Sequence, residues 1–184
     1  MPRLTHFDRQ GRAKMVDVSR KAETLREAVV RGSISMQPAT FKKIMTGQIS
    51  KGDVLAVAKV AGIMAAKKTS DIIPMCHPLN LSHVEVRFYP VEKASRIDIE
   101  ARVRIKAQTG VEMEGLVAVA AAGLTIYDMC KAIDRGMVLS DIHLVRKTGG
   151  KSGTYVAKRK ALKQGSRGPG SKGSSETVKS VSHL

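Results

Sequence analysis

The chain of 184 residues has no tryptophan, and aromatic residues make up only 3% of it. Its core must therefore be aliphatic, which a hydrophobic content of 42% allows. Two cysteines are too few for the disulfide framework of a small secreted domain, so we expect reduced thiols and a cytoplasmic protein. The first ten residues lack the apolar stretch of a signal peptide, and the longest uncharged apolar run, residues 115–127, is too short to span a bilayer.

Negative charge is also scarce, because 16 acidic side chains oppose 32 basic ones and leave a net charge of +16. Residues 146–184 contribute +9 of this total. From residue 157 onward the chain is basic, rich in glycine and serine, and poor in apolar residues. We therefore expect a catalytic domain over residues 1–156 and a disordered basic tail over residues 157–184. The domain itself is moderately basic, which suits an anionic partner without identifying one.

The apolar periodicity predicts the elements of the domain. Alternation with a period of two predicts strands in the second half of residues 22–36 and over residues 81–89, 96–107 and 137–145. Helical spacing predicts helices over residues 38–46, 54–69 and 110–136. Apart from one additional helix, this order is that of an α+β ferredoxin-like fold, in which helices cover one face of an antiparallel sheet.

The helix predicted at residues 110–136 is apolar and rich in alanine, yet it carries acidic side chains near its start and an Asp–Lys pair near its end. At about 100° per residue, Glu114, Asp128 and Lys131 lie on one face of this helix. The spacing of Asp128 and Lys131 lets their side chains meet. Such a pair can transfer protons, but surface ion pairs of this kind are common and weak, so both interpretations stay open.

The start of the same helix has a competing structural interpretation. Thr109 and Glu112 match a capping box, which favours a capping role for Glu112. Glu114 has no such explanation, although an anion near a helix start is favourable. At about 1.5 Å per residue, Glu114 and Asp128 lie about 21 Å apart along the axis, too far for one small reacting centre. If both ends serve one site, a second subunit must supply one of them.

A second motif is the segment from Met75 to His77, which lies between two prolines and is therefore a rigid, extended loop. One cysteine beside one histidine lacks the ligand spacing of a zinc site, and nothing near Cys76 in the sequence supports a nucleophilic role. Hydrogen bonding or proton transfer to a substrate by His77 fits better. An ordinary turn histidine is the plain alternative.

The lysines suggest phosphate binding. Lys51 precedes a helix, and Lys147 and Lys151 enclose two glycines in a short loop. Backbone amides of such a loop can approach phosphate oxygens while the lysines supply charge. The spacing is not that of a Walker loop, and a flexible junction before the tail is the alternative.

Taken in order, several segments closely resemble the cyclic pyranopterin monophosphate synthase family of molybdenum cofactor biosynthesis, also called the molybdenum cofactor biosynthesis protein C family. These segments are KAET at 21–24, KGDVLAVAKVAGIMAAKKT at 51–69, IPMCHPL at 73–79, KAQTGVEMEGL at 106–116, LTIYDMCKA at 124–132 and KTGGKSG at 147–153. The match covers about residues 3–156. In combination, the CHPL, GVEME and TIYDMCKA motifs are highly specific.

The resemblance implies an enzyme, a phosphorus–oxygen lyase. Its substrate is 3′,8-cyclo-7,8-dihydroguanosine 5′-triphosphate, which a partner radical SAM GTP cyclase makes. Its products are cyclic pyranopterin monophosphate and pyrophosphate, and it needs no cofactor and no metal. The resemblance also implies a ferredoxin-like fold and a homohexamer, a trimer of dimers, with sites at the dimer interface.

By motif, the resemblance assigns an acid–base centre to Asp128, Lys131 and Lys51. It assigns substrate binding to Met75, Cys76, His77, Glu112, Met113 and Glu114. Ring opening and reclosure need several proton transfers, for which a lysine of lowered pKa beside a carboxylate in a partly dry pocket is suited. Departing pyrophosphate needs positive charge, which we assign to Lys21, Lys147 and Lys151.

Two other functions suit a basic ferredoxin-like domain less well. An RNA-binding sheet presents aromatic side chains for stacking, but Phe88 and Tyr89 are adjacent and should point to opposite faces. The tail alone could bind nucleic acid non-specifically and with a steep dependence on salt. A purely structural oligomer would leave Glu114, Asp128 and Lys131 unexplained. We therefore expect no specific nucleic acid and no membrane as partners.

Overall fold

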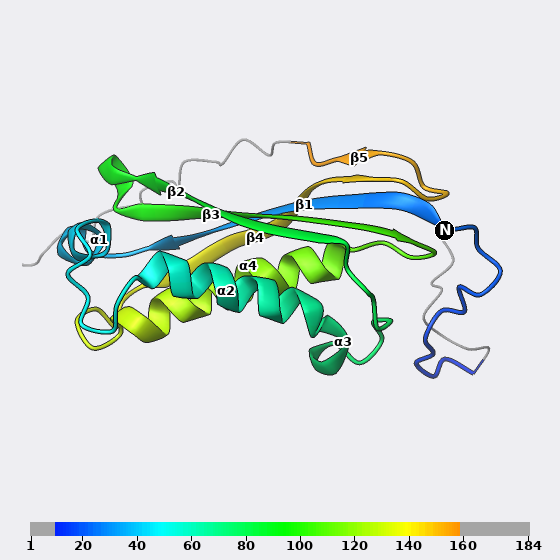
Figure 1. The fold of residues 1–184 in the computed structure, drawn as a ribbon, viewed down its shortest axis with the longest axis horizontal. Helices are drawn as coiled ribbons and strands as arrows, with labels where there is room; N and C mark the ends of the chain where they lie inside the picture. The colour runs from blue at the N-terminus through cyan, green and yellow to red at the C-terminus, as the bar shows by residue number, and fades with distance from the viewer. Residues whose placement is uncertain (1–9, 159–184) are drawn as a thin grey trace, which may run out of the picture.

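Alternating apolar residues build a five-stranded antiparallel sheet with the order β2-β3-β1-β4-β5 (Figure 1). The strands are β1 (Thr24–Ser35), β2 (His83–Val91), β3 (Arg96–Ala107), β4 (Val138–Thr148) and β5 (Tyr155–Val156). This computed structural model describes residues 10–158, so nearly all of the predicted tail lies outside the described residues. Strand β3 lies between β1 and β2, and β1 lies between β3 and β4. Each of these two arrangements, with one strand inserted between two others, is a split β-α-β unit of the predicted ferredoxin-like fold.

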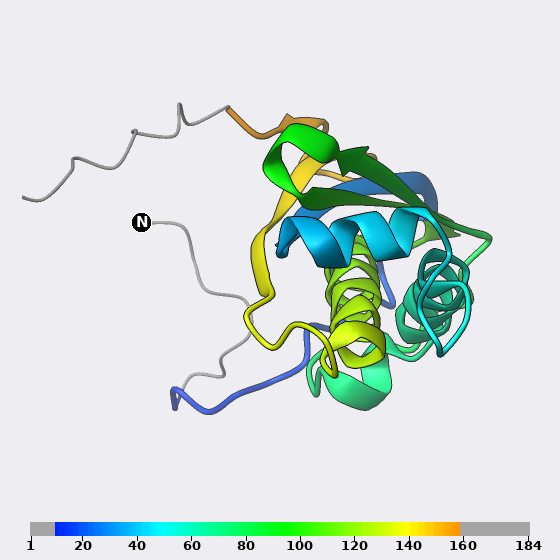
Figure 2. The same cartoon turned by 90° about the vertical axis from the view of Figure 1, so that its left-hand side faces the viewer.

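The helices all lie on one face of the sheet (Figures 1 and 2). They are α1 (Pro38–Met45), α2 (Val54–Lys67), α3 (Thr69–Ile72) and α4 (Glu112–Cys130). Helix α4 packs against β1, β3 and β4, and α2 packs against α4 and β2. Helix α1 is the additional helix of the prediction, and Pro38 occupies its first turn as expected.

Strand β3 shows why the sheet has one covered face. Its alternate residues Ile97, Ile99, Ala101, Val103 and Ile105 are all buried in the core, as predicted. The charged residues between them lie on the other face, where two of them pair with residues of β1. Glu100 pairs with Arg31 of β1, and Arg104 pairs with Glu27 of β1, which also binds Arg146 of β4. An antiparallel sheet tolerates one solvated face of this kind.

Strands β1 and β2 each extend past one of their predicted ends. Strand β1 begins at Thr24, well before the second half of the segment that we expected to be extended. Strand β2 continues through Pro90 to Val91, although we expected it to end at the proline. Because β2 is the outermost strand, Pro90 needs no partner on its free side. Phe88 packs against the core and Tyr89 is exposed, so the two aromatic side chains do point to opposite faces.

Helix α4 ends at Cys130, six residues before the predicted end at Gly136. The cause is Asp134, which is buried and accepts hydrogen bonds from the amides of Gln37 at 2.8 Å and Gly136 at 2.9 Å. An aspartate that binds amides in this way offers the backbone an alternative to the helix. By length and composition α4 would also suit a membrane span, but half of its apolar window is buried within the protein. Its packing against the sheet is that of a core helix.

Candidate active site

A cluster of three charged side chains lies at the C-terminal end of α4. The Lys131 ammonium lies 2.7 Å from Asp128 Oδ1. The Lys51 ammonium lies 3.3 Å from Asp128 Oδ2 and donates to the Asp128 carbonyl oxygen at 2.9 Å. The structure thus brings together the three residues assigned to the acid–base centre, including Lys51 from a distant loop.

The loop that carries Lys51 is fixed by the start of α2. Asp53 is the N-cap of this helix, and its carboxylate accepts hydrogen bonds from the amides of Leu55 and Ala56, each at 3.0 Å. Such a cap satisfies amides that have no partner within the helix. It therefore holds Lys51, two residues earlier, at the end of α4.

The electrostatics of this cluster contradict one expectation. Hydrogen bonds from Lys131 and Lys51 lower the pKa of Asp128, and the same bond raises the pKa of Lys131. We expected a lysine of lowered pKa in a partly dry pocket. In the single chain, however, the Lys131 and Asp128 side chains are 53% and 59% exposed, so the hydrogen bond and the opposite charge outweigh desolvation. The single chain therefore holds Lys131 charged.

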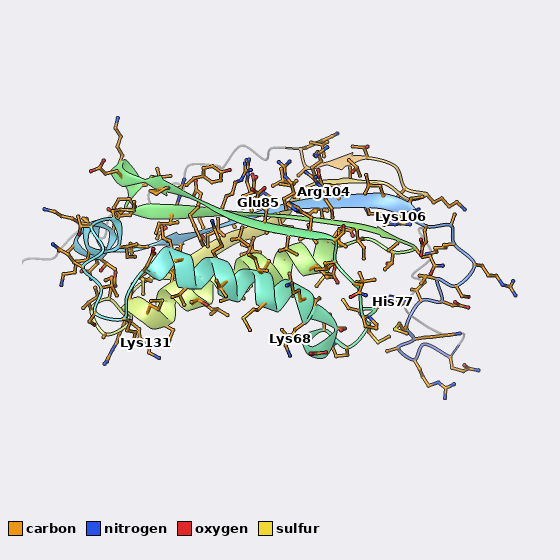
Figure 3. All side chains as sticks on the ribbon, viewed as in Figure 1. Lys68, His77, Glu85, Arg104, Lys106 and Lys131 are labelled. Atoms are coloured by element: carbon orange, nitrogen blue, oxygen red, sulfur yellow. The ribbon has the colours of Figure 1, made fainter. Side chains whose placement is uncertain are left out.

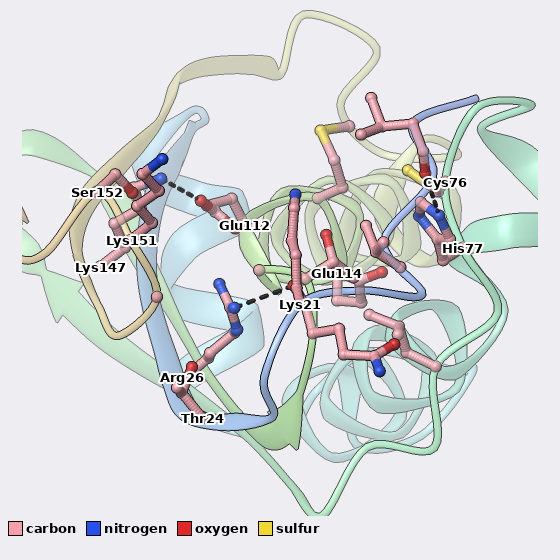
Figure 4. A pocket seen from close by; sticks show the side chains of 18 of the residues that line it. Lys21, Thr24, Arg26, Cys76, His77, Glu112, Glu114, Lys147, Lys151 and Ser152 are labelled. Atoms are coloured by element: carbon pink, nitrogen blue, oxygen red, sulfur yellow. Dashed lines mark hydrogen bonds and ion pairs between the residues drawn. The ribbon is translucent and has the colours of Figure 1, made fainter. Parts of the chain in front are cut away.

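A cavity of about 820 Å³ lies at the other end of α4 (Figure 4). Its walls come from the segment before β1, the loop after α3, the N-terminal turn of α4 and the loop after β4. The nine residues assigned to substrate binding all line it: Lys21, Met75, Cys76, His77, Glu112, Met113, Glu114, Lys147 and Lys151. Segments that are distant in the sequence thus meet in one place, as the resemblance implies.

The two sides of this cavity differ in chemistry. Lys147 and Lys151 lie on one side and Cys76 and His77 on the other, with Glu114 between them (Figure 4). The His77 ring is fixed by a hydrogen bond of 2.9 Å between its Nε2 and the Val16 carbonyl oxygen. As Nε2 donates this bond, the other ring nitrogen is the one that can serve a ligand. One side therefore suits phosphate, and the other suits a ring with polar edges.

Glu114 is a carboxyl group of the cavity whose pKa is strongly shifted. Its side chain is buried, with 3% of the residue exposed. Burial raises its pKa from the ordinary 4.5 to about 7, and the negative charge of Glu112 adds to the shift. Burial and then the charge of Glu114 also raise the pKa of the Cys76 thiol, which argues against a nucleophilic thiolate. Near neutral pH, Glu114 is able to give or take a proton.

The capping role predicted for Glu112 is wrong. The N-cap of α4 is Val111 and not Thr109, and this N-cap residue makes no side-chain capping hydrogen bond. The Glu112 carboxylate instead accepts a hydrogen bond from the Lys147 ammonium at 2.7 Å. The capping motif predicted the wrong partner for Glu112, because the actual partner, Lys147 near the end of β4, is 35 residues away in the sequence.

The sequence analysis missed Arg26, which lines the same cavity. Its guanidinium donates to the carbonyl oxygens of Ala107 at 2.8 Å and Gln108 at 3.0 Å. It also lies against Gly150, where a Cβ atom would overlap it and where φ is +74°. Arg26 thus ties β1 to the loops before α4 and after β4. No local pattern marks it, because its partners are remote in the sequence.

One chain keeps the two groups of residues apart. Figure 3 shows His77 and Lys131 at opposite ends of the helical layer. The 19 residues of α4 separate the cavity from the charged cluster. A rise of about 1.5 Å per residue makes that distance too large for one small molecule. Within residues 10–158, no three His, Cys, Asp or Glu side chains gather in a way that would hold a metal ion.

The fold and the cavity define a class: a ferredoxin-like α+β protein whose cationic and carboxylate side chains suit a small anionic molecule. The model of the MoaC family matches residues 15–150. The chain therefore belongs to the MoaC family, as the motifs indicated.

Curated relatives that match this chain over nearly their whole length share one name. A protein of Heliobacterium modesticaldum named cyclic pyranopterin monophosphate synthase is 61% identical over 156 residues, which cover 85% of this chain and 98% of the relative. A protein of the same name from Desulfitobacterium hafniense is 61% identical over 83% of this chain and 93% of the relative. One from Thermoanaerobacter pseudethanolicus is 62% identical over 83% of this chain and 96% of the relative.

Proposed function

We propose that this chain converts 3′,8-cyclo-7,8-dihydroguanosine 5′-triphosphate to cyclic pyranopterin monophosphate with release of pyrophosphate. This is a lyase step of molybdenum cofactor biosynthesis. Relatives that are similar over nearly their whole length bear the name of this activity. The observation that carries the proposal is that the nine residues assigned to the substrate line one cavity. Residues 1–156 form the catalytic domain of this proposal, and residues 157–184 form the basic tail.

The cavity suits a nucleotide in size and in chemistry. Its volume of about 820 Å³ falls in the range of about 300–1,000 Å³ that is usual for small-molecule sites. Lys147, Lys151 and Lys21 supply positive charge for a triphosphate. Glu114 and His77 supply acceptors and proton-transfer groups for the ring system. The cyclic phosphate then forms as pyrophosphate departs toward the lysines.

The acid–base centre of each site comes, in this proposal, from a second subunit. Two α4 helices that pack antiparallel about a twofold axis would bring the cavity of one subunit to Asp128 and Lys131 of the other. Exposed apolar side chains support such packing on the helical layer: Val57, Val60 and Met64 of α2 and Leu124 of α4 are 45–61% exposed. Burial between subunits would also desolvate Lys131 and counter the rise in its pKa.

The wider setting is part of the same proposal. We propose a homohexamer built as a trimer of such dimers, and a cytoplasmic location. A radical SAM GTP cyclase would supply the cyclised nucleotide. No cofactor takes part in this proposal, because side chains can supply the proton transfers that ring opening and reclosure need and the positive charge that departing pyrophosphate needs.

The decisive experiment is incubation of the purified protein with the cyclised nucleotide. We expect one pyrophosphate and one cyclic pyranopterin monophosphate per substrate, measured by enzyme-coupled phosphate detection and mass spectrometry. Lys131→Ala is the control that should abolish both products. If the wild-type protein binds the nucleotide and releases no pyrophosphate, the proposed activity is wrong.

A further inference from the structure

We propose that Glu112 is an internal competitor for the substrate's phosphates: its carboxylate binds Lys147, and an incoming phosphate must take this lysine from it. The inference rests on the function proposed above, because it requires phosphate to enter this cavity. It assigns to Glu112 the selection of complete nucleotides over bare pyrophosphate.

The contact between the two side chains carries the argument. Glu112 Oε1 lies 2.7 Å from Lys147 Nζ, and the side chains are 26% and 29% exposed. Both line the cavity, so the ion pair faces the space that a ligand would occupy (Figure 4). Carboxylate and phosphate oxygens form the same charge-assisted hydrogen bond with an ammonium group. A phosphate at this place therefore competes directly with Glu112.

The neighbouring cations are engaged differently. The Arg26 guanidinium donates to the carbonyl oxygens of Ala107 and Gln108, which are fixed parts of the backbone. Lys147, by contrast, is held by a side chain that can rotate away. Among the described residues, Glu112 is the hydrogen-bond partner of its ammonium group. Lys147 is thus the cation whose partner a ligand can exchange.

The displaced Glu112 carboxylate can bind a new hydrogen-bond donor only when the ligand is a complete nucleotide. Once phosphate holds Lys147, Glu112 is left near Glu114, whose pKa it already raises by its charge. A guanine-derived ring carries N–H donors that can satisfy such a carboxylate, whereas pyrophosphate carries none. Glu112 would therefore favour the substrate and return to Lys147 when only pyrophosphate is left, which speeds release of this product.

The test is calorimetric binding of inorganic pyrophosphate to the intact oligomer. We expect Glu112→Gln to bind pyrophosphate about fivefold more tightly than the wild type, because the lost competition is that of one partly exposed ion pair. The matched control is Glu92→Gln, which removes the same charge from an exposed position in the turn between β2 and β3. It should leave the affinity unchanged if net charge is not the cause.

A second variant breaks the pair without removing a charge. A Cβ atom at Gly110 would overlap the carboxylate of Glu112, the flexible end of its side chain. Gly110→Ala should therefore move Glu112 off Lys147 and strengthen pyrophosphate binding by about twofold. Both variants should also show a reduced kcat/KM for the nucleotide, since Glu112 is lost or misplaced as an acceptor.

The outcomes separate the two proposals. Tighter pyrophosphate binding with weaker use of the nucleotide supports the competitor role of Glu112. Unchanged or weaker pyrophosphate binding in Glu112→Gln overturns this role, while turnover by the wild type leaves the proposed function intact. A wild-type protein that neither binds pyrophosphate nor turns over the nucleotide overturns both.

Discussion

Two inactive variants, Glu114→Gln and Lys131→Ala, are expected to restore activity when they share one oligomer. Glu114 lies in the cavity at one end of α4, and Lys131 lies beyond the last turn at the other. If each site joins the cavity of one subunit to the charged cluster of the next, the two changes fall in the same site of a hybrid dimer. The other site of that dimer then carries neither change.

The size of the recovery follows from the symmetry. Equal amounts of the two variants, exchanged at random, give hybrids in half of the dimers, and each hybrid has one intact site of two. We therefore expect about 25% of the wild-type turnover per subunit from the mixture. Each variant alone should retain about 1% or less, because loss of an acid–base group commonly costs about 10²–10⁴-fold.

The assay is pyrophosphate release after coexpression of the two variants with different affinity tags, which allows hybrids to be purified. The matched control combines a Lys51→Ala subunit with a Lys131→Ala subunit. Both substitutions lie in the same charged cluster, so every site of the hybrid dimer still carries one substitution. This control should stay inactive. Hybrids of Glu114→Gln and Lys131→Ala that are no more active than their parents would refute a site shared between subunits.

Three further predictions concern single groups. Burial raises the pKa of Glu114 from 4.5 to about 7, so the free energy of unfolding should fall by at most about 3 kcal/mol as pH rises between these values. Urea unfolding at a fixed protein concentration measures this dependence on pH. The variant Glu114→Gln should lack it. Asp128→Asn should lower the pKa of Lys131 toward its ordinary value, which NMR titration of the lysine side chain would show; an unchanged pKa would mean that Asp128 is not the cause. Asp53→Ala should cost about 1 kcal/mol of unfolding free energy in thermal or urea unfolding, and Asp53→Asn should restore most of it, since either side chain can cap α2.

The elements of the fold could be predicted because they depend on local pattern. Alternation in β3 marked its buried face, and Pro38 marked the start of α1. The ends of elements were less predictable, since they depend on remote partners. Helix α4 stops where the buried Asp134 binds the amide of Gln37, 97 residues away in the sequence. Pro90 is tolerated because β2 lies at the edge of the sheet.

The sequence by itself determined the family, the order of elements and the residue types available for chemistry, because motifs and periodicity are properties of neighbouring residues. Only the tertiary structure decided how these residues are combined. It placed nine of them around one cavity, paired Glu112 with Lys147 rather than with its own helix, and added Arg26. It also raised the pKa of Glu114 by burial and that of Lys131 through Asp128. These outcomes depend on desolvation and on contacts across the fold, which local sequence does not contain.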